Sequence, residues 1–69
     1  MTLYNIIMAT PMHQTITVDD YITGEVLIDC ETVHNIIGSR CFIQELQNLQ
    51  VYKLEIDKEY GSLIVHVCE

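Results

Sequence analysis

Basic side chains are the scarcest feature of this sequence. Its 69 residues include only three Lys and Arg against ten Asp and Glu, which gives a net charge of −7. No Lys or Arg precedes Arg40, whereas five carboxylates do. Because proteins bind nucleic acid mainly through Lys and Arg that neutralise phosphates, this composition disfavours direct binding of DNA or RNA. A surface of one sign instead attracts partners of the opposite sign.

Long apolar runs and Gly-rich motifs are also missing. The chain has no apolar run of about 18 residues, which a transmembrane helix requires, and its first residues lack the basic start of a secretory signal. We therefore expect neither a membrane span nor a leader, and a cytoplasmic protein. The three glycines fit no phosphate-binding motif, and the three cysteines are odd in number and not closely paired. Their spacing favours reduced thiols over a disulfide framework.

The composition nevertheless indicates a folded protein. Hydrophobic residues make up 49% of the chain and charged residues 19%, which is richer in apolar side chains than disordered segments are. The length predicts a single domain over residues 1–69 with one small core. Apolar side chains that such a core cannot hold would form a surface patch, so we also expect a possible homodimer.

The first half of the chain reads as short strands. Residues 3–9 form an Ile-rich apolar stretch closed by Pro11, which predicts a strand buried on both faces. Residues 15–18 and 25–29 predict a hairpin around a turn at 19–24. An alternative is a short helix capped by Thr17 and ended by Gly24, which would be marginal alone.

The second half contains the clearest elements. Residues 30–38 fit either a helix or a strand, whereas Ser39 can cap a helix whose buried face holds Phe42, Leu46 and Leu49. Residues 51–56 and 62–68 predict a hairpin. Its core faces are predicted to hold Tyr52, Leu54 and Ile56 in the first strand and Leu63, Val65 and Val67 in the second. The whole is an α+β domain, β-β-β-α-β-β, with a mostly antiparallel sheet and one packed helix.

Metal binding and catalysis have little support in the sequence. The possible ligands or nucleophiles are Cys30, His34, Cys41, His66 and Cys68. They include no C-x-x-C pair, so ordinary packing is favoured over a zinc site, and no cofactor or metal is expected. A Cys with a His could act as a nucleophile, but a concave site of several hundred cubic ångströms is not expected in so small a domain. The sequence thus predicts a protein that is not an enzyme.

The acidic residues carry the functional prediction. They can simply be a solvated face, or they can dock on a basic surface of another protein. The candidate partner-binding residues are Asp19, Asp20, Glu25, Asp29 and Glu31, with Tyr21 as an aromatic anchor. This predicts a nucleic-acid mimic, such as a phage or mobile-element inhibitor of a host enzyme complex. The alternative is a small homo-oligomeric accessory or assembly protein, and a third possibility is a zinc-stabilised module.

Overall fold

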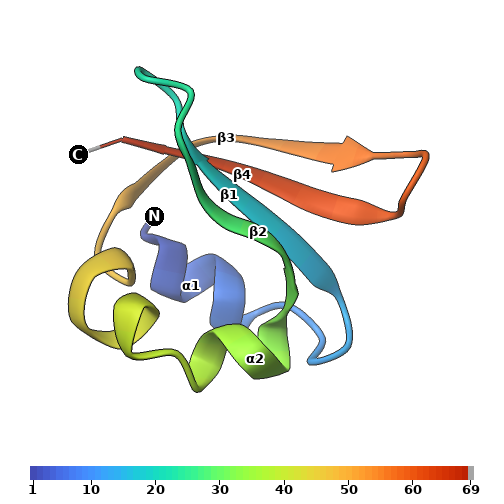
Figure 1. Cartoon of the computed structure of the whole chain (residues 1–69), viewed down its shortest axis with the longest axis horizontal. Coiled ribbons are helices and arrows are strands. Elements are labelled where there is room, and N and C mark those ends of the chain that lie inside the picture. The colour runs from blue at the N-terminus through green and yellow to red at the C-terminus, as the bar shows by residue number, and fades with distance from the viewer. Residues whose placement is uncertain (69) are drawn as a thin grey trace.

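The chain folds into one sheet with helices packed on one of its faces (Figure 1). The computed structural model describes residues 1–68. The elements, in order, are α1 (Leu3–Met8), β1 (Thr15–Asp20), β2 (Val26–Thr32), α2 (Val33–Ile37), the π-helical turn η1 (Phe42–Leu46), β3 (Gln50–Asp57) and β4 (Ser62–Cys68). The predicted α+β class and the mostly antiparallel sheet are confirmed.

The strand order of the sheet is β2-β1-β4-β3. The two hairpins, β1–β2 and β3–β4, are antiparallel, whereas β1 and β4 pair in parallel at the centre of the sheet. β2 and β3 are therefore the outer strands. In Figure 1 the helices lie below the sheet, and the β3–β4 hairpin extends past them on one side.

The core lies between the sheet and the helices. Its fully buried strand residues alternate along the central strands, as expected for a sheet covered on one face. The buried apolar residues are Leu3, Ile7, Ile16, Val18, Val33, Ile36, Phe42, Leu46, Val65 and Val67. Every helical segment and both central strands contribute, so one small core holds all the layers together.

The predicted strand over residues 3–9 is wrong, because this segment is helix α1. Thr2 begins the helix with a capping box, in which its hydroxyl accepts the Asn5 N–H and the Asn5 side chain accepts the Thr2 N–H. Leu3 and Ile7, one helical turn apart, are fully buried, whereas Tyr4 and Met8 are exposed. The cap and the core contact override the strand preference of the Ile-rich composition.

The predicted hairpin at residues 15–29 is confirmed, and the alternative helix does not form. β1 is followed by a tight turn in which one Asp20 carboxylate oxygen accepts the N–H groups of Ile22 and Thr23. Gly24 has a positive φ of 77° and donates its N–H to the Asp20 carbonyl. An Asp that bonds to the backbone two residues on is typical of a turn, and glycine accepts the positive φ without strain.

Residues 30–38, which the sequence allows as either helix or strand, begin as strand and continue as helix. β2 continues to Thr32, whose hydroxyl accepts the Asn35 N–H and caps α2. Gly38 and Ser39 lie between α2 and η1. The predicted buried positions Phe42 and Leu46 are confirmed, but η1 has no side-chain cap from Ser39.

The predicted hairpin at the end of the chain is confirmed, but one of its predicted core faces is wrong. Val65 and Val67 of β4 are fully buried and Leu63 partly so. On β3, by contrast, Tyr52, Leu54 and Ile56 are 59%, 45% and 70% exposed. A register shift between Val51 and Lys53 breaks the alternation, and β3 is an outer strand beyond the helix layer.

Candidate functional site

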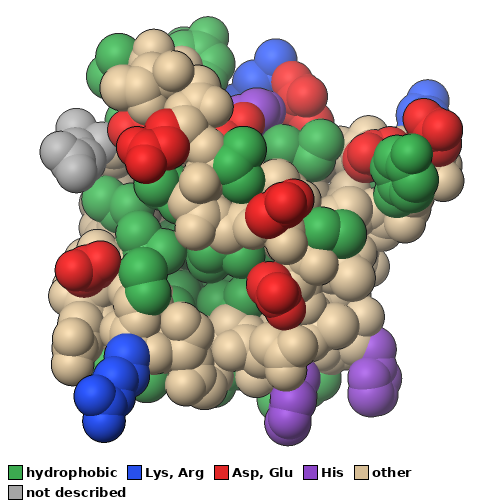
Figure 2. All heavy atoms as spheres, viewed as in Figure 1, with side chains coloured by type: hydrophobic (Ala, Val, Ile, Leu, Met, Phe, Trp, Pro, Cys, Tyr) green, Lys and Arg blue, Asp and Glu red, His purple; other side chains and the backbone are tan. Residues whose placement is uncertain are grey.

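A hollow in the surface lies between the outer strand β2 and the α2–η1 segment. Its volume is about 420 Å³. Figure 2 shows this hollowed face, with hydrophobic side chains at its floor and acidic side chains around it. The lining residues are Leu27, Ile28, Asp29, Glu31, Asn35, Ile36, Ser39, Cys41 and Leu46. An apolar floor with polar groups at its edge is the usual composition of a binding site.

A second hollow of about 270 Å³ adjoins the first. It is lined by Asp20, Glu25, Leu27, Glu45, Leu46, Leu49, Val67 and Cys68. Leu27 of β2 and Leu46 of η1 line both hollows. The two hollows are therefore neighbours, and together they are called here the acidic groove, with β2 on one side and the helical segments on the other.

Carboxylates are the only charged side chains that line the acidic groove within residues 1–68. They are Asp20, Glu25, Asp29, Glu31 and Glu45. All but Asp20 are exposed, and Asp20 is half-buried. Arg40 stands between the lining residues Ser39 and Cys41 in the sequence but does not itself line the groove. Low-dielectric walls and charges of one sign concentrate the field in such a depression, which favours a cationic ligand.

The β2 wall of the groove is irregular. The pairing of β1 with β2 shifts register on both sides of Val18, and Cys30 has a positive φ of 51°. The Cys30 N–H donates to the Thr17 hydroxyl instead of a backbone carbonyl. A non-glycine residue with positive φ is strained, and bulges of this kind discourage further strand pairing at a sheet edge. The free edge of β2 is therefore a poor template for an added strand.

The η1 wall contributes a thiol and a carboxylate one turn apart. Cys41 donates its S–H to the Glu45 carboxylate over 3.5 Å. Partial desolvation, together with this hydrogen bond and the charge of Glu45, raises the pKa of the Cys41 thiol. A raised pKa lowers the fraction of reactive thiolate. Cys41 therefore presents a neutral, weakly nucleophilic side chain to the groove.

Four of the six predicted partner-binding residues meet at the acidic groove. Asp20 and Glu25 line the smaller hollow, and Asp29 and Glu31 line the larger one. Asp20 also holds the β1–β2 turn through its two accepted N–H bonds, and Glu31 accepts a hydrogen bond from the Asn35 side chain of α2. Glu25 and Asp29 are exposed, so they are the carboxylates with the greatest freedom to meet a ligand.

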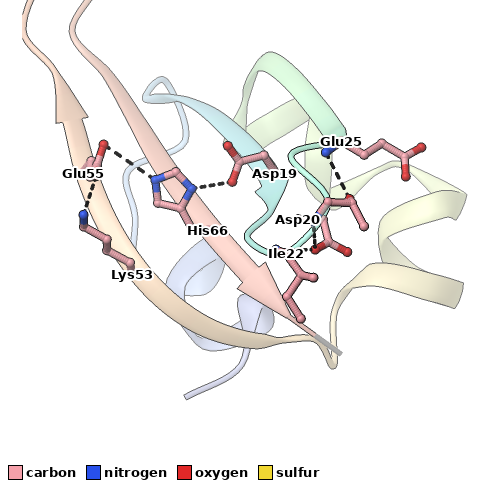
Figure 3. A network of polar contacts seen from close by, with 8 residues as sticks. Asp19, Asp20, Ile22, Glu25, Lys53, Glu55 and His66 are labelled. Carbon is pink, nitrogen blue, oxygen red and sulfur yellow. Dashed lines mark hydrogen bonds and ion pairs between the residues drawn. The ribbon is translucent and has the colours of Figure 1, made fainter.

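The other two predicted residues, Asp19 and Tyr21, are not lining residues of the groove. An Asp19 carboxylate oxygen lies 2.5 Å from His66 Nδ1. The other ring nitrogen of His66, Nε2, lies 3.6 Å from a Glu55 carboxylate oxygen (Figure 3). Tyr21 stacks on Tyr52 with ring centroids 4.0 Å apart. Asp19 is thus committed to a contact between the central strands, while Tyr21 belongs to a separate aromatic pair.

The same polar network includes two charged residues of β3. The Lys53 ammonium lies 2.8 Å from the Glu55 carboxylate. Their hydrogen bond and attraction lower the pKa of Glu55 and raise the pKa of Lys53. Figure 3 shows Lys53, Glu55, His66 and Asp19 as one chain of contacts. Both ring nitrogens of His66 thus face carboxylate oxygens, so neither is directed at a cysteine.

Sequence reasoning missed the groove itself and one of its carboxylates. Glu45 completes the acidic rim from η1, although it is far from the other four in sequence. The apolar floor comes from Leu27, Leu46 and Val67, on three different elements. The helical spacing of Cys41 and Glu45 could have placed these two together, but the position of η1 opposite β2 depends on tertiary packing. A concave site of several hundred cubic ångströms is little expected from so small a core, whereas the larger hollow measures about 420 Å³.

The cysteines and histidines suggested as metal ligands do not converge. Cys30, Cys41 and Cys68 are free thiols. In residues 1–68 no three His, Cys, Asp or Glu side chains are grouped so that they could hold a metal ion. None of the helices described for these residues has the length and apolar character needed to cross a membrane.

The comparisons with known proteins give no relative for this chain. No protein-family model matches it, and no curated protein or solved structure matches it either.

Proposed function

We propose that this chain is a non-enzymatic protein-binding module that docks its acidic groove on a basic surface of another protein. The observation that carries the proposal is the set of five carboxylates lining a hollow that no Lys or Arg of residues 1–68 lines. Complementary charge steers two proteins together and rejects partners of the wrong sign. The net charge of −7 adds to that steering at long range.

Nucleic-acid-binding surfaces are a ready source of such partners, because they display Lys and Arg in grooves. A protein whose acidic groove receives a Lys- or Arg-bearing part of such a surface competes with nucleic acid for the same cations. The proposed role therefore includes inhibition of a nucleic-acid enzyme, of the kind exerted by small phage or mobile-element proteins. Asp20, Glu25, Asp29, Glu31 and Glu45 are the carboxylates that would make the contact.

Two matched pairs of variants test the proposal by fluorescence anisotropy with a labelled peptide of Lys, Leu and Ala. The groove pair is Glu25→Gln with Glu31→Gln, and the control pair is Glu55→Gln with Glu59→Gln. Both pairs remove two negative charges, so they share one net charge. We expect the groove pair to weaken peptide binding roughly 2- to 30-fold and the control pair to leave it nearly unchanged. Raising the salt should weaken binding to the unaltered protein.

Equal losses from the two pairs would mean that the peptide responds only to net charge, and the proposed groove contact would then be wrong. Affinity that is insensitive to salt would also contradict it, because contacts between exposed charges are screened. Circular dichroism of each variant checks that the fold is retained.

A second candidate function, a homo-oligomeric accessory protein, is favoured by the outer edge of β3. Leu54 and Ile56 are exposed there, and Lys53 and Glu55 carry opposite charges. Residues 50–61 contain two cations and three carboxylates, a net charge of −1, so a second copy meets little repulsion at this edge. Exposed apolar edge strands are templates for pairing with another chain.

Sedimentation equilibrium tests this second candidate. The chain is expected to dimerise with increasing concentration, and Leu54→Lys is expected to return it to a monomer. Ile22→Lys, which places the same charge at an exposed Ile of the β1–β2 turn, is the control. A protein that stays monomeric at all concentrations, or a dimer that Leu54→Lys does not disturb, rules out assembly through this edge.

A further inference from the structure

We infer that the acidic groove recognises a basic segment that also carries two apolar anchor side chains, one for each hollow. This inference rests on the proposed function and names the chemistry of its partner. It follows from the floor of the groove, where a purely electrostatic contact would leave the partly exposed Leu27, Ile28 and Leu49 in contact with water. The occupant is thus a basic amphipathic segment of another protein, with Lys or Arg beside its apolar residues.

The apolar floor is continuous across both hollows. Leu27 and Leu46 lie where the hollows meet, with Ile28 and Ile36 on one side and Leu49 and Val67 on the other. The volumes of the two hollows are about 420 and 270 Å³. Ile36, Leu46 and Val67 are already almost fully buried, so apolar anchors would cover mainly the partly exposed Leu27, Ile28 and Leu49. The anchors would also bury their own apolar surface, and such burial is the main source of affinity in most protein contacts.

The carboxylates are placed to pair with cations on both sides of the anchors. Asp29 and Glu31 line the larger hollow, and Glu25 and Glu45 line the smaller one. A segment with basic residues on both sides of each anchor can therefore pair those residues with carboxylates of the groove. A neutral apolar segment would leave these carboxylates unpaired beside a desolvated surface, which is costly.

The bound segment is expected to insert its side chains rather than to extend the sheet. β2 lines the groove, but its register shifts and the positive φ of Cys30 interrupt the edge that an added strand would need. On the opposite wall, η1 and α2 present side chains and no sheet edge. An amphipathic segment that lays its apolar face into the groove matches both walls.

Four labelled peptides test the inference by anisotropy. The first has Lys residues flanking two Leu, the second replaces one Leu by Ser, the third replaces both, and the fourth keeps both Leu but replaces each Lys by Gln. We expect each lost Leu to weaken binding roughly 10- to 100-fold, and the Gln peptide to bind weakly as well. Equal binding of the first and third peptides would overturn the inference while leaving the charge-based function intact.

A groove-filling variant makes the same test from the protein side. Cys41→Phe places a large side chain in the larger hollow without changing any charge, because Cys41 lines it and is exposed. The control is Ile43→Phe, since Ile43 is 50% exposed on the same η1 turn and lines neither hollow. We expect Cys41→Phe to weaken the two-Leu peptide at least 10-fold and to leave the two-Ser peptide unaffected, and Ile43→Phe to change neither.

Three outcomes separate the possibilities. Loss of binding by both peptides in Cys41→Phe would contradict the anchor role of the hollow. Failure of all four peptides to bind at low salt would contradict the proposed function together with the inference. A dimer seen by sedimentation equilibrium that Cys41→Phe dissociates would show that a second copy occupies the groove, which also overturns the inference.

Discussion

Replacing Phe42 by alanine is expected to lower the free energy of unfolding by about 3–5 kcal/mol. Phe42 is only 3% exposed, and it belongs to the core beneath the sheet. Truncation of a buried aromatic ring removes its transfer free energy and leaves a cavity that neighbours only partly fill. A domain of 69 residues has roughly 3–10 kcal/mol of total stability, so this loss would remove a large share of it.

The control for this prediction is the next residue. Ile43 is 50% exposed on the same π-helical turn, and Ile43→Ala is expected to cost less than about 1 kcal/mol. Urea denaturation followed by circular dichroism measures both variants. If Phe42→Ala leaves no folded protein, Phe42→Leu should show a smaller, measurable loss. Similar losses for Phe42→Ala and Ile43→Ala would contradict the placement of η1.

Ile7→Ala is expected to cost about 2–5 kcal/mol, whereas Met8→Ala is expected to cost less than about 1 kcal/mol. Ile7 is fully buried and its neighbour Met8 is 53% exposed, as the helical spacing of α1 requires. Both residues are apolar and adjacent in sequence, so a difference between the two losses reflects their difference in burial. Thermal or urea unfolding gives both values.

The same comparison distinguishes the helix from a buried strand. In a strand buried on both faces, Ile7 and Met8 would both face packed neighbours and both truncations would be costly. Comparable losses of more than about 2 kcal/mol at both positions would therefore contradict helix α1. A large loss at Ile7 alone supports the capped helix.

Local pattern was enough to predict the elements whose neighbours in sequence are also their neighbours in space. The β3–β4 hairpin and the β1–β2 hairpin were predicted because turn residues stand between β-branched runs. The burial of Phe42 and Leu46 followed from their helical spacing. These features depend on contacts between residues that are close in sequence. Such contacts can be predicted from the order of residue types.

Features that depend on distant packing were not predictable in this way. The Ile-rich composition of α1 predicts a strand, whereas the Thr2–Asn5 capping box begins a helix. The exposure of Leu54 and Ile56 depends on β3 being an outer strand beyond the helices. Charge composition gave four of the groove carboxylates but could not separate them from Asp19, whose side chain is directed at His66 by the parallel pairing of β1 and β4.

The parallel pairing of β1 and β4 also governs when the acidic groove can form. β1 and β4 meet across 47 positions, as the Asp19–His66 contact shows, and contacts of such separation are slow to form. The β1–β2 hairpin that precedes them is at best marginally stable alone. During synthesis, therefore, the emerging chain cannot complete its sheet until β4 has been made, and Val67, part of the groove floor, arrives only with that strand. The protein is expected to form its acidic groove in a single late folding step.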